Sequence, residues 1–184
     1  MLKQIVSRVP LLNRVAKTAI MSLRRRTFQS PSYWEKRYAT GGSSGHGSTG
    51  DLAAFKADTV NSFVKEYNVR SVVEFGCGDG DQLSLANYPE YVGLDISPTA
   101  IETCRGRFAS DATKRFFLYT RGNSAYRADM ALSLDVIYHL VEDAIFQAYM
   151  TDLLGSADRY VVIYSDNRDF FEPNYPHVRH RQFE

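Results

Sequence analysis

The sequence lacks any apolar stretch of about 18 residues, the length that a membrane-spanning helix needs. Cysteine is also scarce: Cys77 and Cys104 are too few for the disulfide framework of a small secreted protein. There are no internal repeats and no Gly-Lys-Ser/Thr phosphate loop. A net charge of +1 favours neither nucleic acid nor a membrane as a partner. The 184 residues have an ordinary globular composition, enough for one domain, and we expect the protein in the reducing cytoplasm.

Charge is unevenly distributed along the chain. The first 30 residues carry seven basic side chains and no acidic one, which leaves 15 basic and 21 acidic residues in the remainder. Residues 1–27 alternate basic and apolar positions, which fits peripheral contact with an anionic membrane, a targeting peptide or a plain helical extension. Pro10 interrupts any single long helix there and weakens the membrane interpretation. We therefore divide the chain into a basic extension, 1–30, and a domain, 31–184.

Strand-like and helix-like segments alternate through this domain. Most of the strand-like runs are apolar on both faces, which is typical of a parallel sheet covered by helices on both sides. The predicted fold is therefore an α/β domain with a doubly wound, mostly parallel sheet. Strands are predicted over 71–75, 91–96, 115–120, 128–137 and 159–165, and helices over 32–38, 51–69, 82–86, 98–110 and 142–155. A Gly/Ser-rich loop, 41–50, could order over a ligand as a lid.

Three glycines at alternate positions, Gly76, Gly78 and Gly80, follow the first strand. Bare backbone in such a turn lets a ligand come close beyond the carboxyl end of the strand. The dinucleotide fingerprint would need its third glycine at position 81, which is Asp81. Asp79 and Asp81 would also repel a pyrophosphate. A nicotinamide-dependent oxidoreductase is therefore only a distant alternative, and a cationic or zwitterionic nucleoside fits better.

The glycine turn and two later segments resemble the motifs of one family. EFGCGDG (74–80) is similar to the first motif of the class I S-adenosylmethionine-dependent methyltransferases. YVGLDIS (91–97) resembles their second strand with its terminal acid, and ADMALSLDVIYHLVED (128–143) resembles their fourth-strand motif. These segments occur in the family's order within residues 71–165. The resemblance implies S-adenosylmethionine as the cofactor and methyl transfer to an oxygen or nitrogen atom of a small molecule.

The resemblance also assigns cofactor contacts to the ends of the strands. Asp95 would accept both ribose hydroxyls, with a place in the cap of the next helix as the alternative. Glu74 would organise the turn and the cofactor's ammonium group, and Leu134 and Asp135 would lie at its methionine portion. Asp79 would lie near the cationic portion or remain a solvated turn residue. The complete predicted cofactor set is Glu74, Gly76, Cys77 (backbone only), Gly78, Asp79, Gly80, Asp95, Ile96, Leu134, Asp135 and Tyr38.

The residues after the fourth strand are the predicted substrate side of the site. Methyl transfer is an in-line displacement, so that alignment of the two reactants is the enzyme's main contribution. His139 would act as a base or substrate contact, or would simply begin the next helix. Tyr138 would form a wall of the pocket. His177 and His180 lack neighbouring cysteines or carboxylates in the sequence, so we predict no metal site.

Two features depart from the family pattern. The segment after the third strand lacks the acid that many relatives place against the adenine amino group, so Thr120, Asn123 or Ser124 would have to substitute. After Ser165 only 19 residues remain, too few for the crossover helix and the last two strands of a seven-stranded sheet. Strand 159–165 would then be an exposed apolar edge. We expect either a fragment of a longer protein or an edge that a partner covers, and a catalytically inactive interaction module is the alternative function.

Overall fold

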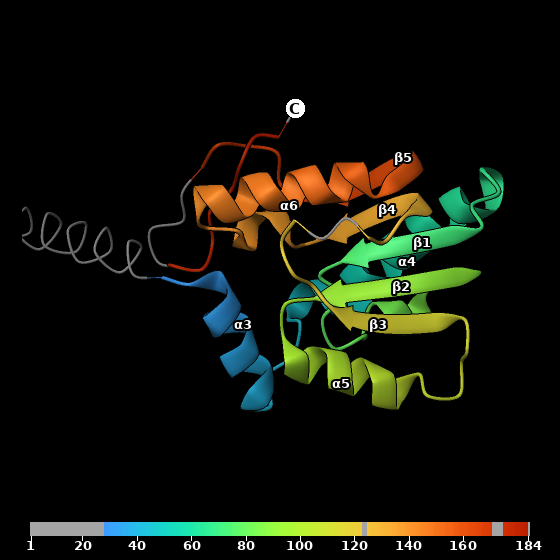
Figure 1. Cartoon of the computed structure of the whole chain (residues 1–184), viewed down its shortest axis with the longest axis horizontal. Coiled ribbons are helices and arrows are strands. Elements are labelled where there is room, and N and C mark those ends of the chain that lie inside the picture. The colour runs from blue at the N-terminus through green and yellow to red at the C-terminus, as the bar shows by residue number, and fades with distance from the viewer. Residues whose placement is uncertain (1–27, 123–124, 171–174, 184) are drawn as a thin grey trace, which may run out of the picture.

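The computed structural model describes residues 28–122, 125–170 and 175–183 of the chain (Figure 1). The segment for which membrane contact or targeting was considered, 1–27, lies outside these residues, as do Asn123 and Ser124. Within the described part of the chain, no helix is both long enough and apolar enough to cross a membrane.

Five parallel strands form a single sheet, which confirms the predicted fold class. The sheet has the order β3-β2-β1-β4-β5, so that chain order switches direction between β1 and β4. In the described residues no strand pairs with the outer edge of β5. The strands are β1 (Ser71–Phe75), β2 (Glu90–Asp95), β3 (Lys114–Leu118), β4 (Ala128–Leu134) and β5 (Ala157–Tyr164).

Helices cover both faces of this sheet. Helices α4 (Gly50–Glu66) and α5 (Pro98–Arg107) pack on one face, with the short 3₁₀ helix η2 (Leu83–Leu85), and α6 (Asp143–Gly155) packs on the other. The buried stripe of α4 follows the helical period and consists of Ala53, Lys56, Ala57, Val60 and Val64. Helix α5 begins where expected, because the Ser97 hydroxyl accepts the Ala100 N–H and proline stands at the first helical position.

The N-terminal helix α3 (Ser30–Ala39) crosses the carboxyl ends of the strands (Figure 1). Ser30 donates its N–H and its hydroxyl to the Glu142 carboxylate, at 2.9 and 2.5 Å. At the other side of the sheet, Glu35 accepts the hydroxyls of Ser97 and Thr99 at the start of α5, at 2.5 and 2.7 Å. Helix α3 is therefore fixed to both halves of the domain. The 3₁₀ helix η1 (His46–Ser48) follows it.

The fourth strand is shorter than predicted. β4 ends at Leu134 rather than at residue 137, because Asp135 takes the left-handed conformation with φ 60° and turns the chain out of the sheet. Residues Ile137–His139 then form the 3₁₀ helix η3. This turn presents the side chains of Asp135, Tyr138 and His139 beyond the sheet edge instead of burying them in a ladder.

Candidate active site

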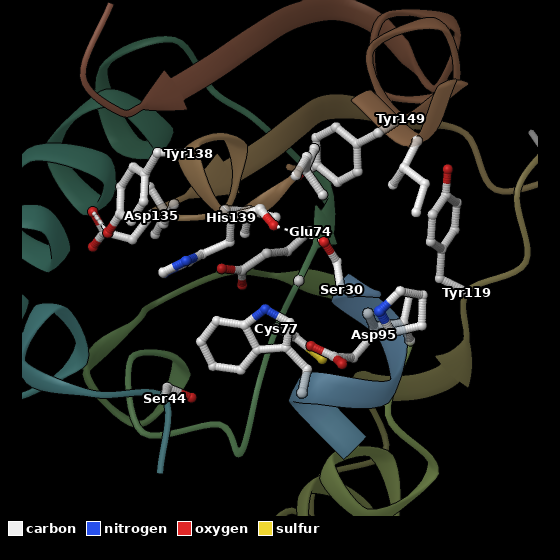
Figure 2. Close-up of a pocket in the computed structure, with 18 of the residues that line it drawn as sticks. Ser30, Ser44, Glu74, Cys77, Asp95, Tyr119, Asp135, Tyr138, His139 and Tyr149 are labelled. Carbon is white, nitrogen blue, oxygen red and sulfur yellow. Dashed lines mark hydrogen bonds between the residues drawn. The ribbon is translucent and has the colours of Figure 1, made fainter. Parts of the chain in front are cut away.

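A cavity of about 810 Å³ lies at the carboxyl ends of the strands, beneath α3. Ligands of doubly wound sheets bind at this edge, near the switch in strand order. Its walls come from α3, the turns after β1 and β2, the ends of β3 and β4, η3 and α6. In Figure 2 the side chains of Glu74, Asp95 and His139 point into the cavity, with Tyr138 at one end of the view and Tyr119 at the other. Ten of the 13 site residues predicted from the sequence line this cavity.

Only the first part of the glycine turn lines the cavity. Gly76 lines it with φ 83°, and a Cβ there would lie 2.4 Å from Val136 Cγ2, so a side chain cannot be accommodated. Gly78 and Gly80 face Ser44 and Phe108 instead and are not among the lining residues. These two glycines, predicted as cofactor contacts, therefore fit the turn against its neighbours.

Asp79 also lies outside the cavity lining. Its carboxylate accepts the Ser44 N–H at 3.1 Å and the Ser44 hydroxyl at 2.7 Å. The Tyr38 and Ser44 hydroxyls are 3.1 Å apart, and both residues line the cavity. Asp79 thus ties the Gly/Ser loop to the turn after β1, and its predicted place near the cationic portion of the cofactor stays a prediction.

Two carboxylates are buried at the ends of the neighbouring strands β1 and β2. Asp95 accepts the Gly78 N–H at 3.0 Å and the Ser97 N–H at 2.9 Å, and burial raises its pKa to about 6 against the opposing effect of these hydrogen bonds. Glu74 is 3% exposed and accepts the Tyr91 hydroxyl at 2.6 Å. Burial raises the Glu74 pKa to about 7, which the Tyr91 hydrogen bond and the Lys56 charge partly oppose. Both carboxyls line the cavity.

A third carboxylate, Asp135, is paired with a lysine that sequence reasoning missed. Lys56 is 2% exposed and forms an ion pair with Asp135 Oδ2. The Tyr138 hydroxyl donates to the other oxygen at 3.1 Å. A lysine inside the apolar stripe of α4 is the signal that could have revealed this pair, since buried lysines need a partner.

Gln82 is a further lining residue that the sequence did not single out. It is 8% exposed, and its Nε2 donates to the Ala53 carbonyl at 3.0 Å. A carbonyl only accepts, so the atom facing it is the amide nitrogen and the other is the oxygen Oε1. None of the described residues donates to that buried oxygen. A buried acceptor without a donor costs free energy, and a donor on a ligand would relieve that cost.

His139 lies in an aromatic corner of the cavity. Its ring meets the edge of Trp34 at 4.7 Å between centroids, and its Nδ1 is 3.0 Å from the His177 carbonyl oxygen. Burial lowers the His139 pKa to about 4, and the His177 hydrogen bond only partly opposes this. The ring is therefore uncharged at neutral pH and is a weaker base than free imidazole. Trp34 lines the cavity as well.

The far end of the cavity lies between β3 and α6. The Tyr119 hydroxyl donates to Asp152 at 2.6 Å, and the Gly122 N–H donates to the same carboxylate at 2.8 Å. Tyr149 forms the adjoining wall, with its hydroxyl 2.6 Å from the Ser133 hydroxyl. Neither tyrosine was singled out from the sequence, since no local motif marks them. Thr120, one of the adenine candidates, does line the cavity.

The predicted site residues therefore separate into two groups. Those that line the cavity are Tyr38, Glu74, Gly76, Cys77, Asp95, Ile96, Leu134, Asp135, Tyr138 and His139. Those that support the turn from outside are Gly78, Asp79 and Gly80. In the described part of the chain, no three His, Cys, Asp or Glu side chains are grouped so that they could hold a metal ion.

Solved structures with a similar fold are methyltransferases. The methyltransferase domain of bacterial CtHen1-C matches with a TM-score of 0.55 and 24% identity, over 64% of this chain and 67% of that one. N-methyltransferase NodS from Bradyrhizobium japonicum WM9, solved with S-adenosyl-L-homocysteine, matches with a TM-score of 0.60 and 15% identity, over 77% and 75%. Magnesium protoporphyrin IX methyltransferase from Synechocystis PCC 6803, also solved with S-adenosylhomocysteine, matches with a TM-score of 0.50 and 20% identity, over 60% of this chain and 54% of that one. This chain thus spans about half the length of the last protein. No protein-family model matches the sequence, and no curated protein is significantly similar to it.

Proposed function

Because the chain has the fold of the class I S-adenosylmethionine-dependent methyltransferases, we propose that its cavity binds S-adenosylmethionine and that it methylates an oxygen or nitrogen atom of a small molecule. When bound, the cofactor supplies a methyl group on a sulfonium centre. The protein's part is to bind the cofactor, exclude water and align the methyl acceptor.

The observation that supports this proposal best is the chemistry of the cavity lining. Three carboxyls line the cavity at the ends of β1, β2 and β4: Glu74, Asp95 and Asp135, the last of which is paired with Lys56. The Gln82 oxygen beside them lacks a donor among the described residues. Arg121 is the one lysine or arginine among the lining residues in the described part of the chain. A lining of this kind repels a pyrophosphate and suits a cationic nucleoside that carries hydroxyl and ammonium donors.

The fit can be assigned group by group. Asp95 would accept from the ribose hydroxyls while keeping its two backbone hydrogen bonds, since a carboxylate has about four acceptor sites. Glu74 and Gln82 would accept from the ammonium group. The end of β3, with Thr120, would face the adenine. Tyr138 and His139 would then face the methyl acceptor, and the neutral His139 ring would accept a hydrogen bond from its N–H or O–H group.

Calorimetry with S-adenosylhomocysteine tests the proposal. The Asp95→Ala variant should bind more weakly by about 1.5–3 kcal/mol, which is roughly 10- to 150-fold in Kd. Asp81→Asn is the matched control, because Asp81 is an acid of the same turn that pairs with Arg107 and does not line the cavity. A folded wild-type chain that fails to bind the ligand would refute the proposal.

An inactive interaction module remains a second candidate, favoured by one observation. The outer edge of β5 has no partner strand in the described residues, and open sheet edges recruit other chains. This candidate predicts no turnover and solubility that depends on a partner. A radiolabelled methyl-transfer assay against small alcohols, phenols and amines would distinguish the two functions.

A further inference from the structure

The C-terminal segment, residues 175–183, lies against the wall of the cavity that carries His139. The Arg179 N–H donates to the Tyr138 carbonyl at 2.7 Å. Arg181 is 7% exposed and donates to the Leu140 and Val141 carbonyls, at 3.1 and 2.8 Å. These contacts fix the segment to the chain immediately around η3.

A carboxylate on α6 strengthens this attachment. Arg179 and Arg181 both donate to Asp143 Oδ1, at 2.9 and 2.7 Å. The Arg181 guanidinium also lies 4.6 Å above the Phe146 ring. Buried arginine with several charge-assisted hydrogen bonds is among the more secure anchors that a short segment can have.

His177 connects this segment to the cavity. Its ring stacks on Tyr33 of α3, with centroids 4.8 Å apart and planes 13° from parallel. Its carbonyl oxygen lies 3.0 Å from His139 Nδ1. Because a carbonyl cannot donate, Nδ1 must carry the proton of the neutral ring, and the opposite nitrogen, Nε2, is then unprotonated. None of the described residues forms a hydrogen bond with Nε2.

Other charged groups also act on this ring. The His177 carbonyl and Asp135, at the end of β4, favour the charged ring, whereas the His177 side chain and Arg37 of α3 disfavour it. Burial has the largest effect and lowers the His139 pKa. The covering residues include Trp34 from α3 and His177 from the C-terminal segment. The segment thus acts on His139 both as a hydrogen-bond partner and as a cover.

We propose that the C-terminal segment is a positioning element of the active site: the His177 carbonyl holds the His139 proton on Nδ1, so that Nε2 accepts a hydrogen bond from the methyl acceptor. The hydrogen bond from the methyl acceptor to Nε2 orients the acceptor's attacking lone pair toward the methyl group. The catalytic part of this inference rests on the proposed function, whereas the tautomer rests on the contacts of the ring alone.

Nuclear magnetic resonance of the ¹⁵N-labelled full chain tests the inference without any cofactor. Long-range ¹H–¹⁵N spectra report which ring nitrogen is protonated, and the His139→Asn variant assigns the signal among the four histidines. In the wild type we expect the Nδ1–H form, neutral down to about pH 5. In Arg181→Ala we expect a mixture of tautomers and a higher titration midpoint than in the wild type, because the ring loses part of its cover.

Arg127→Ala is the matched control. Arg127 bonds a carboxylate and a backbone carbonyl, those of Asp158 and Gly155, at the opposite end of the strands, so its loss should leave the His139 signal unchanged. If Arg181→Ala does not fold, Arg179→Ala, which removes one of the two bonds to Asp143, decides by the same readout. An Nε2–H ring in the wild type, or an unchanged His139 in the folded anchor variant, would overturn the inference. Failure to bind S-adenosylhomocysteine would instead refute the proposed function and the catalytic role, while the spectra still decide the tautomer.

Discussion

Glu74→Gln should stabilise the protein at high pH and leave it almost unchanged at low pH. The carboxyl is buried at the floor of the cavity, and its hydrogen bond in the described residues comes from the Tyr91 hydroxyl, which a glutamine oxygen can accept equally well. The substitution therefore removes the ionisable group while preserving the shape of the side chain and the hydrogen bond from Tyr91.

The size of the effect follows from the shift in the Glu74 pKa, from an ordinary 4.5 to about 7 in the folded protein. Since the folded pKa is raised, the stability that the protonated carboxyl contributes is fully present below pH 4.5 and is lost as the pH rises through 7. The full difference corresponds to about 3 kcal/mol. Glu74→Gln should thus raise the free energy of unfolding by up to about 3 kcal/mol at pH 8, and by less than about 0.5 kcal/mol at pH 4.

Urea unfolding of both chains at pH 4 and pH 8 measures this difference. Asp81→Asn is again the control, because it removes a more exposed carboxylate from the same turn and should give no gain at pH 8. The same Glu74→Gln variant should bind S-adenosylhomocysteine more weakly at pH 8, since it loses the charge that we propose faces the ammonium group. Equal stability changes at the two pH values would refute the reasoning, because a packing effect does not depend on protonation.

Three further predictions concern the turn, the amino-acid end of the cavity and the N-terminal helix. Gly76→Ala should lose cooperative unfolding in urea melts, because φ is 83° and Val136 Cγ2 would lie 2.4 Å from the new Cβ. In the control Gly106→Ala, on α5, the new Cβ meets nothing within 4 Å, and the free energy of unfolding should rise by about 0.5–1 kcal/mol. Gln82→Met should weaken S-adenosylhomocysteine binding but not that of 5′-methylthioadenosine, which lacks the amino-acid portion, and an equal loss for both ligands in calorimetry would contradict the assignment of Gln82. Glu35→Gln should speed hydrogen exchange of the α3 amides while β1 stays protected, since it weakens the contacts with Ser97 and Thr99; unchanged exchange in α3 would show that this attachment does not hold the helix.

The parts of the fold that could be predicted from sequence are those encoded locally. The five strands, the glycine turn and the Ser97–Pro98 helix start each depend on neighbouring residues, and each was placed within a few positions. The end of β4 was placed too late, because the apolar pattern continues through Val136 and Ile137 although the backbone turns at Asp135.

The parts of the site that were missed depend on contacts distant in sequence. Lys56 meets Asp135 across 79 residues, and Tyr119 meets Asp152 across 33. No local pattern records such partners, and the resemblance to a family supplied only the residues of its motifs. Gly78 and Gly80 match a binding motif, and in the structure they fit the turn against Ser44 and Phe108; their contact with a cofactor stays a prediction.

The attachment of α3 has a consequence for how the protein folds. Ser30 bonds Glu142 across 112 residues, and His139 bonds His177 across 38, so both ends of the described chain are held to the segment between β4 and α6 beside the cavity. The sheet and its flanking helices do not depend on either contact, because their strand pairings and core clusters involve other residues. The binding site should then be the last region to form and the first to open, and ligand should slow its opening while hardly affecting the speed at which the sheet assembles.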